Sequence, residues 1–88
     1  MNFLVFTLPG CSKCDRLKEV MKLKGIESQE FDVSTKDGRL KIREYIKLLR
    51  RDSSGSVLIP TLIIEDNGLA TAVLNSAEEL ELWLKSRV

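Results

Sequence analysis

The two cysteines of the chain lie three residues apart, in the segment Cys11-Ser12-Lys13-Cys14. The segment follows an apolar run over 3–7 and opens a stretch in which apolar residues recur at helical spacing. The first turn of a helix carries unpaired amides and the positive end of the macrodipole, and both favour a thiolate. We therefore predict that Cys11 is a nucleophile. Cys14, one turn further on the apolar side, is shielded until Cys11 forms a mixed disulfide with a substrate. Cys14 is then close enough to attack Cys11 and release the substrate thiol.

Charged residues in the same stretch favour this chemistry. Lys13, Arg16 and Lys18 outnumber Asp15, which leaves a local surplus of two positive charges near Cys11. Solvent screens much of this surplus, but we expect the remainder to favour the thiolate.

Three other roles for the two cysteines stay open. A closed zinc site needs four ligands, and the chain has no histidine and no third cysteine. A structural disulfide over so short a loop would stabilise the fold little. The third alternative is a reduced, buried pair without reactivity. The strand-turn-helix context favours the redox interpretation over all three.

Pro60 is the second residue with special chemistry, because it stands directly before the apolar run Thr61 to Ile64. Proline cannot donate a hydrogen bond to a sheet, so it is excluded from the interior of a central strand. We therefore expect Pro60 either at the start of a strand or after a cis peptide bond.

The first half of the chain predicts a strand, a helix and a second strand. Aromatic and β-branched residues indicate a strand over 3–7. A helix over 12–24, capped by Gly25, is predicted by the helical spacing of Cys14, Leu17, Val20 and Met21. Residues 28–33 form the next expected strand. Since a helix joins the two strands, they should be parallel with a right-handed crossover.

The second half predicts a helix, a hairpin and a closing helix. A capping pattern at Ser34 opens a helix over 37–51, whose apolar stripe is Ile42, Tyr45, Ile46 and Leu49. Strands over 61–64 and 69–74 flank Asn67-Gly68, which favours a two-residue hairpin turn. A second capping pattern, Ser76 to Glu79, begins a helix whose apolar face is Leu80, Trp83 and Leu84. The order β-α-β-α-β-β-α predicts an α/β fold with one mixed four-stranded sheet flanked by helices.

Length and composition predict one domain over residues 1–88. The chain is 43% apolar and 31% charged, which is the balance of a globular protein. A formal net charge of +1 provides no bulk attraction to nucleic acid or to an anionic membrane. No apolar run approaches the roughly 20 residues of a membrane helix, and the first residues carry no basic signal region. We therefore expect a cytoplasmic protein.

Two segments together resemble a known family. They are Thr7-Leu8-Pro9-Gly10-Cys11-Ser12-Lys13-Cys14 after an N-terminal strand and Ile59-Pro60-Thr61 later in the chain. They resemble the active-site and cis-proline segments of glutaredoxins and related small thioredoxin-fold proteins, over nearly the whole chain. The resemblance implies a thioredoxin-like fold and an enzyme that reduces protein disulfides. In that reaction Cys11 attacks the disulfide and Cys14 resolves it.

The resemblance also implies binding residues and partners. As a cis-proline, Pro60 faces the dithiol, and Ile59 offers its main chain to a bound peptide or glutathione in strand-like pairing. The substrate-binding residues so implied are Pro9, Gly10, Ser12, Lys13, Ile59, Pro60 and Thr61. The expected partners are protein disulfides and a reductase or other thiol donor. We expect no metal, no nucleic acid and no membrane as partners, and a monomer.

The chain departs from glutaredoxins at two places that hold glutathione in that family. Leu8 stands where a basic or polar residue is usual, and Leu69 to Ser76 lacks the Gly-Gly pair found after the last hairpin. We therefore expect no required cofactor, and we expect glutathione to be a poor external reductant.

Two functions of other classes stay open beside disulfide reduction. One is a redox-inactive interaction module that keeps the thioredoxin fold and binds partners through the groove at Pro60. The other is an iron-sulfur carrier, in which Cys11 thiolates of two chains share a cluster with external thiols. In addition, the region 36–51 has seven Lys and Arg against two Asp and Glu. We expect this basic stretch to be a solvated face rather than a docking site.

Overall fold

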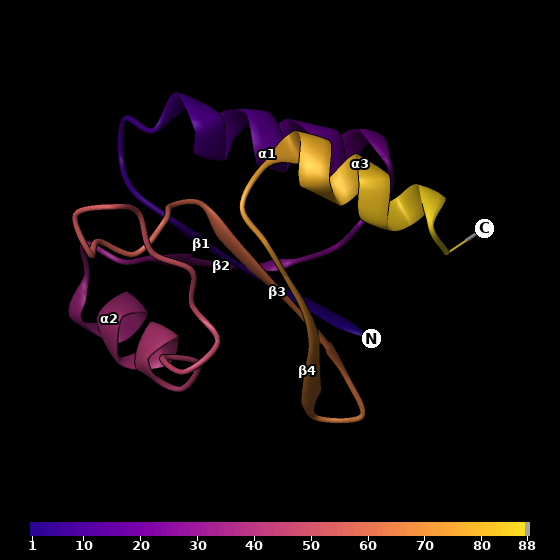
Figure 1. The fold of residues 1–88 in the computed structure, drawn as a ribbon. Coiled ribbons are helices and arrows are strands. Elements are labelled where there is room, and N and C mark those ends of the chain that lie inside the picture. Colours follow the sequence, from indigo (N-terminus) through magenta and orange to yellow (C-terminus); the bar gives the residue numbers. More distant parts are fainter. Residues whose placement is uncertain (88) are drawn as a thin grey trace.

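The computed structural model describes residues 1–87. Its helices and strands follow the order that the sequence predicts (Figure 1). They are β1 (Asn2–Thr7), α1 (Ser12–Leu23), β2 (Gln29–Asp32), α2 (Lys36–Arg43), β3 (Thr61–Asp66), β4 (Leu69–Leu74) and α3 (Ala77–Lys85). Within residues 1–87, none of the helices combines the length and the apolar character needed to cross a membrane.

The four strands form one mixed sheet in the order β2-β1-β3-β4. β1 is parallel to β2, as the intervening helix predicts, with Phe6 opposite Phe31. β1 and β3 are antiparallel, with Phe6 opposite Thr61, and β3 and β4 are antiparallel, with Leu62 opposite Leu74. The predicted α/β fold with a mixed four-stranded sheet is therefore confirmed.

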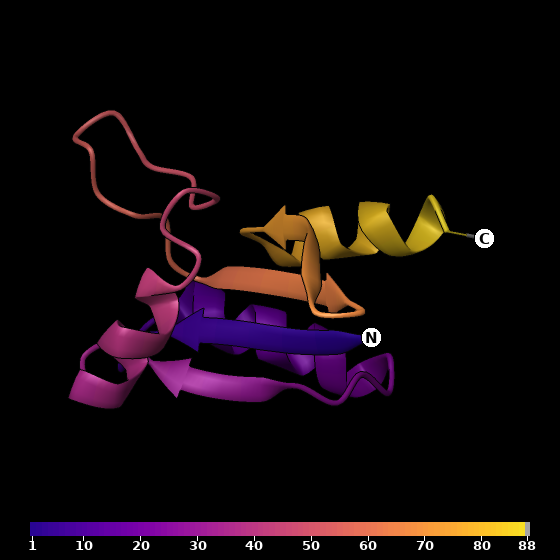
Figure 2. The ribbon, with the colours of Figure 1, turned by 90° about the horizontal axis from the view of Figure 1, so that it is seen from below.

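Helices cover both faces of the sheet. α1 and α3 lie side by side on one face, and α2 lies on the other (Figures 1 and 2). Because side chains alternate along a strand, β1 sends Val5 to one face and Leu4 and Phe6 to the other. The core under α1 and α3 is Val5, Leu17, Met21, Leu62, Ile64 and Leu80. The core on the α2 side is Leu4, Phe6, Tyr45 and Ile63.

The apolar face of α3 packs against the sheet, as predicted. Leu80 is fully buried, and the Trp83 ring meets Phe3 edge-on with the ring centroids 6.0 Å apart. Leu84 packs against the same core. This packing holds α3 against the sheet.

Local sequence rules place several element ends correctly. Cys11 is the N-cap of α1, and Gly25 follows that helix with φ 70°, a conformation that glycine adopts without strain. Asn67 (φ 55°) and Gly68 (φ 79°) form the two-residue turn between β3 and β4. Ser76 caps α3 through its hydroxyl.

The helix predicted over 37–51 is wrong in length. α2 ends at Arg43, and the next amides bond three residues back instead of four, as from Tyr45 to the Ile42 carbonyl at 3.0 Å. The chain then turns so that Tyr45 is buried, while Ile46 is half exposed and lies outside the core. The apolar stripe has the period of a longer helix, but tertiary contacts of Tyr45 override it.

Two further ends differ from the prediction. The N-cap of α2 is Thr35, whose hydroxyl accepts the amide of Gly38 at 3.1 Å. The predicted cap, Ser34, donates instead to the Asp32 carboxylate at 2.6 Å. This turn also ends β2 at Asp32, so the strand is shorter than the predicted 28–33.

Candidate active site

Three segments that are distant in sequence meet at one end of the sheet. β1 leads into Cys11 at the start of α1. β3 enters the sheet at this end after Pro60, because its first residue, Thr61, pairs with Phe6 near the end of β1. β4 leaves the sheet at the same end, since its last residue pairs near the start of β3. The fold therefore brings the dithiol and the proline segment together, with the start of α3 beside them.

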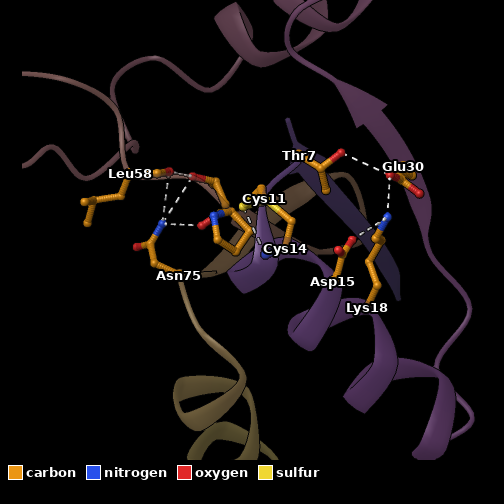
Figure 3. The surroundings of a disulfide bond; sticks show 10 residues. Thr7, Cys11, Cys14, Asp15, Lys18, Glu30, Leu58 and Asn75 are labelled. Carbon is orange, nitrogen blue, oxygen red and sulfur yellow. Dashed lines mark hydrogen bonds and ion pairs between the residues drawn. A yellow bond between two sulfur atoms is a disulfide. The ribbon is translucent and has the colours of Figure 1, made fainter. Parts of the chain in front are cut away.

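Cys11 and Cys14 form a disulfide at the first turn of α1, with their Cα atoms 5.2 Å apart (Figure 3). The Sγ of Cys11 accepts the amide of Cys14 at 3.1 Å, which is the hydrogen bond of an N-cap side chain. Cys14 is 1% exposed, whereas Cys11 is only partly buried. Cys11 is therefore the sulfur that a substrate can reach, and its place at the helix end favours the thiolate.

This geometry bears on the alternative roles of the two cysteines. The sulfurs are bonded to each other, so an unbonded reduced pair does not describe this structure. Within residues 1–87, no group of three or more His, Cys, Asp or Glu side chains is placed to hold a metal ion. Closing so short a loop adds little stability. A disulfide at a partly accessible helix end fits reversible exchange better than a structural role.

Pro60 is buried and follows a cis peptide bond, so the cis-proline implied by the family resemblance is confirmed. Thr61, also buried, donates from Oγ1 to the carbonyl of Leu58 at 2.6 Å. Ile59 is only partly buried. Strand-like pairing with a peptide requires accessible main chain at Ile59, and this role stays a prediction.

The remaining predicted binding residues lie on the turn and the first turn of α1. Pro9, Gly10, Ser12 and Lys13 are all exposed, and Gly10 takes φ 70° to turn the chain from β1 into α1. Lys13 lines a pocket of about 370 Å³ together with Arg16 and with residues 75–78, which lead into α3. The binding roles of these four residues also stay predictions.

Ion pairs neutralise much of the positive surplus expected beside the dithiol. Arg16 pairs with Glu78 of α3 at 3.0 Å, and Lys18 pairs with Glu30 of β2 at 3.1 Å. The hydrogen bond to Glu30 raises the pKa of Lys18. Exposed pairs of this kind contribute about 1 kcal/mol or less to stability. Lys13 has no ion pair within the described part of the chain.

The structure adds Asn75, between β4 and the N-cap of α3, to the residues of the site (Figure 3). Its Nδ2 donates to the Pro60 carbonyl at 3.0 Å and to Thr61 Oγ1 at 3.2 Å. Its main-chain amide donates to Glu79 Oε1 at 2.7 Å. In sequence, an asparagine before a capping serine indicates a turn. Only the pairing of β3 with β4 places it against Pro60.

Comparison with known families decides the class of the protein. The glutaredoxin family model matches residues 3–69, which include both cysteines and Pro60. This chain belongs to the glutaredoxin family. Membership of this family and the Cys11-Cys14 disulfide are both characteristic of a thiol-disulfide oxidoreductase. A comparison with curated proteins found no match.

Solved structures of small redox proteins share the fold of this glutaredoxin-family chain. The thioredoxin-like protein BC3987 gives a TM-score of 0.60 at 28% identity, over 92% of this chain and 97% of that chain. Glutaredoxin from Brucella melitensis gives 0.60 at 23% identity, over 98% and 80%. The glutaredoxin-like NrdH-redoxin from Escherichia coli, which has a thioredoxin-like activity profile, gives 0.60 at 16% identity, over 88% and 84%. The predicted thioredoxin-like fold is thus confirmed.

Proposed function

We propose that the protein is an enzyme that reduces protein disulfides through the Cys11/Cys14 dithiol. The observation that carries the proposal is a disulfide between a partly exposed N-cap cysteine and a buried cysteine one turn later. Such a pair divides attack and resolution between two sulfurs of different accessibility. Membership of the glutaredoxin family supports the same chemistry.

The reaction takes two exchange steps. In the first, the Cys11 thiolate attacks one substrate sulfur, so that a Cys11-substrate bond forms and the substrate S–S bond breaks. The second substrate sulfur leaves as a thiolate and takes a proton. In the second step Cys14 loses its proton and attacks Cys11 Sγ, which forms the intramolecular disulfide and releases the other substrate thiol. Two electrons have then passed from the dithiol to the substrate.

The segment Ile59-Pro60-Thr61 supplies the proposed docking surface for the substrate main chain. An extended peptide adds to such a segment through main-chain hydrogen bonds, and partly buried Ile59 offers these groups close to the dithiol. Exposed Pro9, Gly10, Ser12 and Lys13 form the rim on the side of α1. These positions suit a substrate whose backbone is extended around its disulfide.

The electron donor that we propose is a flavoprotein reductase or another dithiol protein rather than glutathione. Leu8 is apolar and 41% exposed, so its side chain offers neither a charge nor a hydrogen bond to the carboxylates of the tripeptide. The exchange needs no resident cofactor, since the two thiols carry both electrons. We also propose that the protein works as a monomer in the cytoplasm, where thiols are kept reduced.

Reduction of a protein disulfide such as that of insulin, with dithiothreitol regenerating the dithiol, tests the proposal. The wild-type protein should accelerate the reaction over dithiothreitol alone. Cys11→Ser should abolish the acceleration, and Cys14→Ser should reduce it, because dithiothreitol must then resolve the mixed disulfide in place of Cys14. Each variant exchanges one sulfur for oxygen, so the two control for each other.

Two outcomes would contradict the proposed reaction. A Cys14→Ser variant that turns over at the wild-type rate would indicate a monothiol route. A wild-type protein no faster than dithiothreitol alone would indicate a redox-inactive module.

A further inference from the structure

The connection over residues 44–60 carries the proline segment and contains no helix or strand of its own. Figure 2 shows part of it as a loop that stands away from the sheet. Within the loop, Arg51 forms an isolated bridge with Val57, and the Leu58 amide donates to the Arg50 carbonyl at 2.9 Å. These bonds join the two arms of the loop to each other. The second arm leads directly into β3, and contacts from outside the loop add to the restraint on it beside the dithiol.

Asn75 makes such contacts from the connection between β4 and α3. Its Nδ2 donates to the Pro60 carbonyl and to Thr61 Oγ1, with a longer contact of 3.5 Å to the Leu58 carbonyl, and Thr61 Oγ1 donates onward to the Leu58 carbonyl. These acceptors fix the orientation of the amide. As a result, Asn75 Oδ1 is the one buried side-chain polar atom without a hydrogen-bond partner in residues 1–87. Buried polar atoms are rarely left unpaired. The donor contacts of Nδ2 therefore compensate for the unpaired oxygen.

Asn75 is itself held by charged residues from α3 and the loop. Its main-chain amide donates to Glu79, and Glu79 accepts two guanidinium hydrogen bonds from Arg50, at 2.7 and 3.0 Å. Arg50 also donates to the Val73 carbonyl at 2.7 Å. Burial raises the pKa of Glu79, but the bonds from Arg50 and Asn75 outweigh burial and lower the pKa below its ordinary value. The contacts therefore run from the first arm of the loop, through Glu79 and Asn75, to the second arm.

We propose that Asn75 is a positioning residue for disulfide reduction, which holds segment 58–61 so that the Ile59 main chain can pair with a peptide substrate. Asn75 acts through Pro60 and Thr61 rather than on the sulfurs. The proposal rests on the proposed function and adds the group that keeps its docking segment in place. Its loss should impair only substrates that present a peptide backbone.

Kinetics of Asn75→Asp test the proposal, because aspartate keeps the shape of the side chain and removes both Nδ2 donors. The two substrates are a disulfide-bonded peptide and 2-hydroxyethyl disulfide, which has no peptide groups. We expect KM for the peptide to rise about tenfold, as for the loss of roughly one net hydrogen bond. The kcat/KM for 2-hydroxyethyl disulfide and the alkylation rate of Cys11 should stay close to wild type. Asn67→Asp, the same exchange at the exposed hairpin turn, is the matched control and should leave both substrates unaffected.

The outcomes separate this proposal from the proposed function. Equal losses on both disulfides would show a general role in stability, and an unchanged KM for the peptide would show that the segment holds itself; either result overturns the proposal. A wild-type protein that reduces neither disulfide would contradict the proposed function and this proposal with it.

Glu79→Gln provides a second variant in case Asn75→Asp does not fold. It keeps an oxygen for the Asn75 amide and removes the charge that Arg50 binds. KM for the peptide should then rise in the same direction by a smaller factor. An unchanged KM in this variant also overturns the proposal.

Discussion

Cys11 and Cys14 carry the same functional group, but their places one helical turn apart give them different chemistry. Cys11 caps the helix and is partly exposed, whereas Cys14 is buried on the same face as Leu17. The unpaired amides of the first turn favour negative charge at Cys11, and one of them, from Cys14, already points at its sulfur. In the reduced protein this geometry stabilises a thiolate at one of the two positions.

Limiting iodoacetamide should therefore label Cys11 before Cys14 in the reduced protein. The thiolate is the reactive form, and the alkylating reagent can reach only the outer sulfur without opening the fold. Peptide mapping by mass spectrometry identifies the alkylated residue. Cys11→Ser, in which Cys14 alone can react, provides the reference rate. Faster labelling of Cys14 in the wild-type protein would contradict the assignment of the nucleophile.

Tyr45 is the single tyrosine of the chain, and its hydroxyl should lose its proton at a higher pH than the hydroxyl of an unfolded tyrosine. Burial raises the pKa of Tyr45 to about 12, and the hydrogen bond that its hydroxyl donates to Glu65 at 2.8 Å acts in the same direction. The protonated Tyr45 hydroxyl therefore stabilises the folded state fully below pH ~10, where an unfolded tyrosine titrates. This stabilisation is lost as the pH rises toward 12. A phenolate absorbance titration, with and without denaturant, measures both values. Coincident midpoints would show that Tyr45 is not buried.

For the helices and strands, the sequence correctly predicts several ends and turns that depend on residues close together in the chain. Gly25 ends α1 and Asn67-Gly68 forms the hairpin turn because glycine and asparagine accept positive φ. The spacing of the cysteines locates the dithiol, and the family resemblance adds the cis bond before Pro60. The end of α2 and the role of Asn75 could not be predicted. Both depend on residues far away in sequence, Glu65 for Tyr45 and Pro60 for Asn75.

Gly38 tests how closely α2 docks against the end of β2. In an isolated helix, alanine would be favoured over glycine by about 1 kcal/mol. Here a Cβ would overlap the main-chain oxygen of Asp32 and lie 3.1 Å from the Cα of Val33. Because main-chain atoms cannot move aside like a flexible side chain, we expect Gly38→Ala to lower the free energy of unfolding by about 1 to 3 kcal/mol.

Urea denaturation measures the effect of Gly38→Ala. Leu40→Ala removes an exposed side chain from the same helix, and it should change the free energy of unfolding by only about 0.5 kcal/mol. Equal or higher stability of Gly38→Ala than of the wild type would contradict the close packing of α2.

Across the whole molecule, residues of opposite charge from distant parts of the sequence meet at the end that holds the dithiol. Arg16 of α1 and Arg50 of the long loop both pair with acidic residues at the start of α3, Glu78 and Glu79. The acidic last third of the chain thus neutralises part of the basic charge around the site. The other cations of the region 36–51 are mostly exposed, in keeping with the solvated face that the sequence predicts.

Which electron donor the protein uses depends on several segments at the end of the molecule that holds the dithiol. We expect slow NADPH consumption with glutathione and glutathione reductase, and faster consumption with a thioredoxin-reductase-type system. The reason is that Leu8 and the stretch Leu69 to Ser76 depart from the residues that hold the tripeptide in glutaredoxins. Leu8→Lys should raise the glutathione-dependent rate and leave the reductase-dependent rate unchanged. Efficient turnover of the wild-type protein with glutathione would place it among glutathione-dependent enzymes.

The most direct test of two-cysteine exchange is the intermediate itself. Cys14→Ser, incubated with a protein disulfide and analysed by mass spectrometry without reductant, should accumulate a mixed disulfide between Cys11 and the substrate. The wild-type protein should show little of it, because Cys14 resolves it, and Cys11→Ser should show none. Failure of the Cys14→Ser protein to form a bond from Cys11 to the substrate, or an equal yield of adduct on Cys14 in Cys11→Ser, would contradict the mechanism.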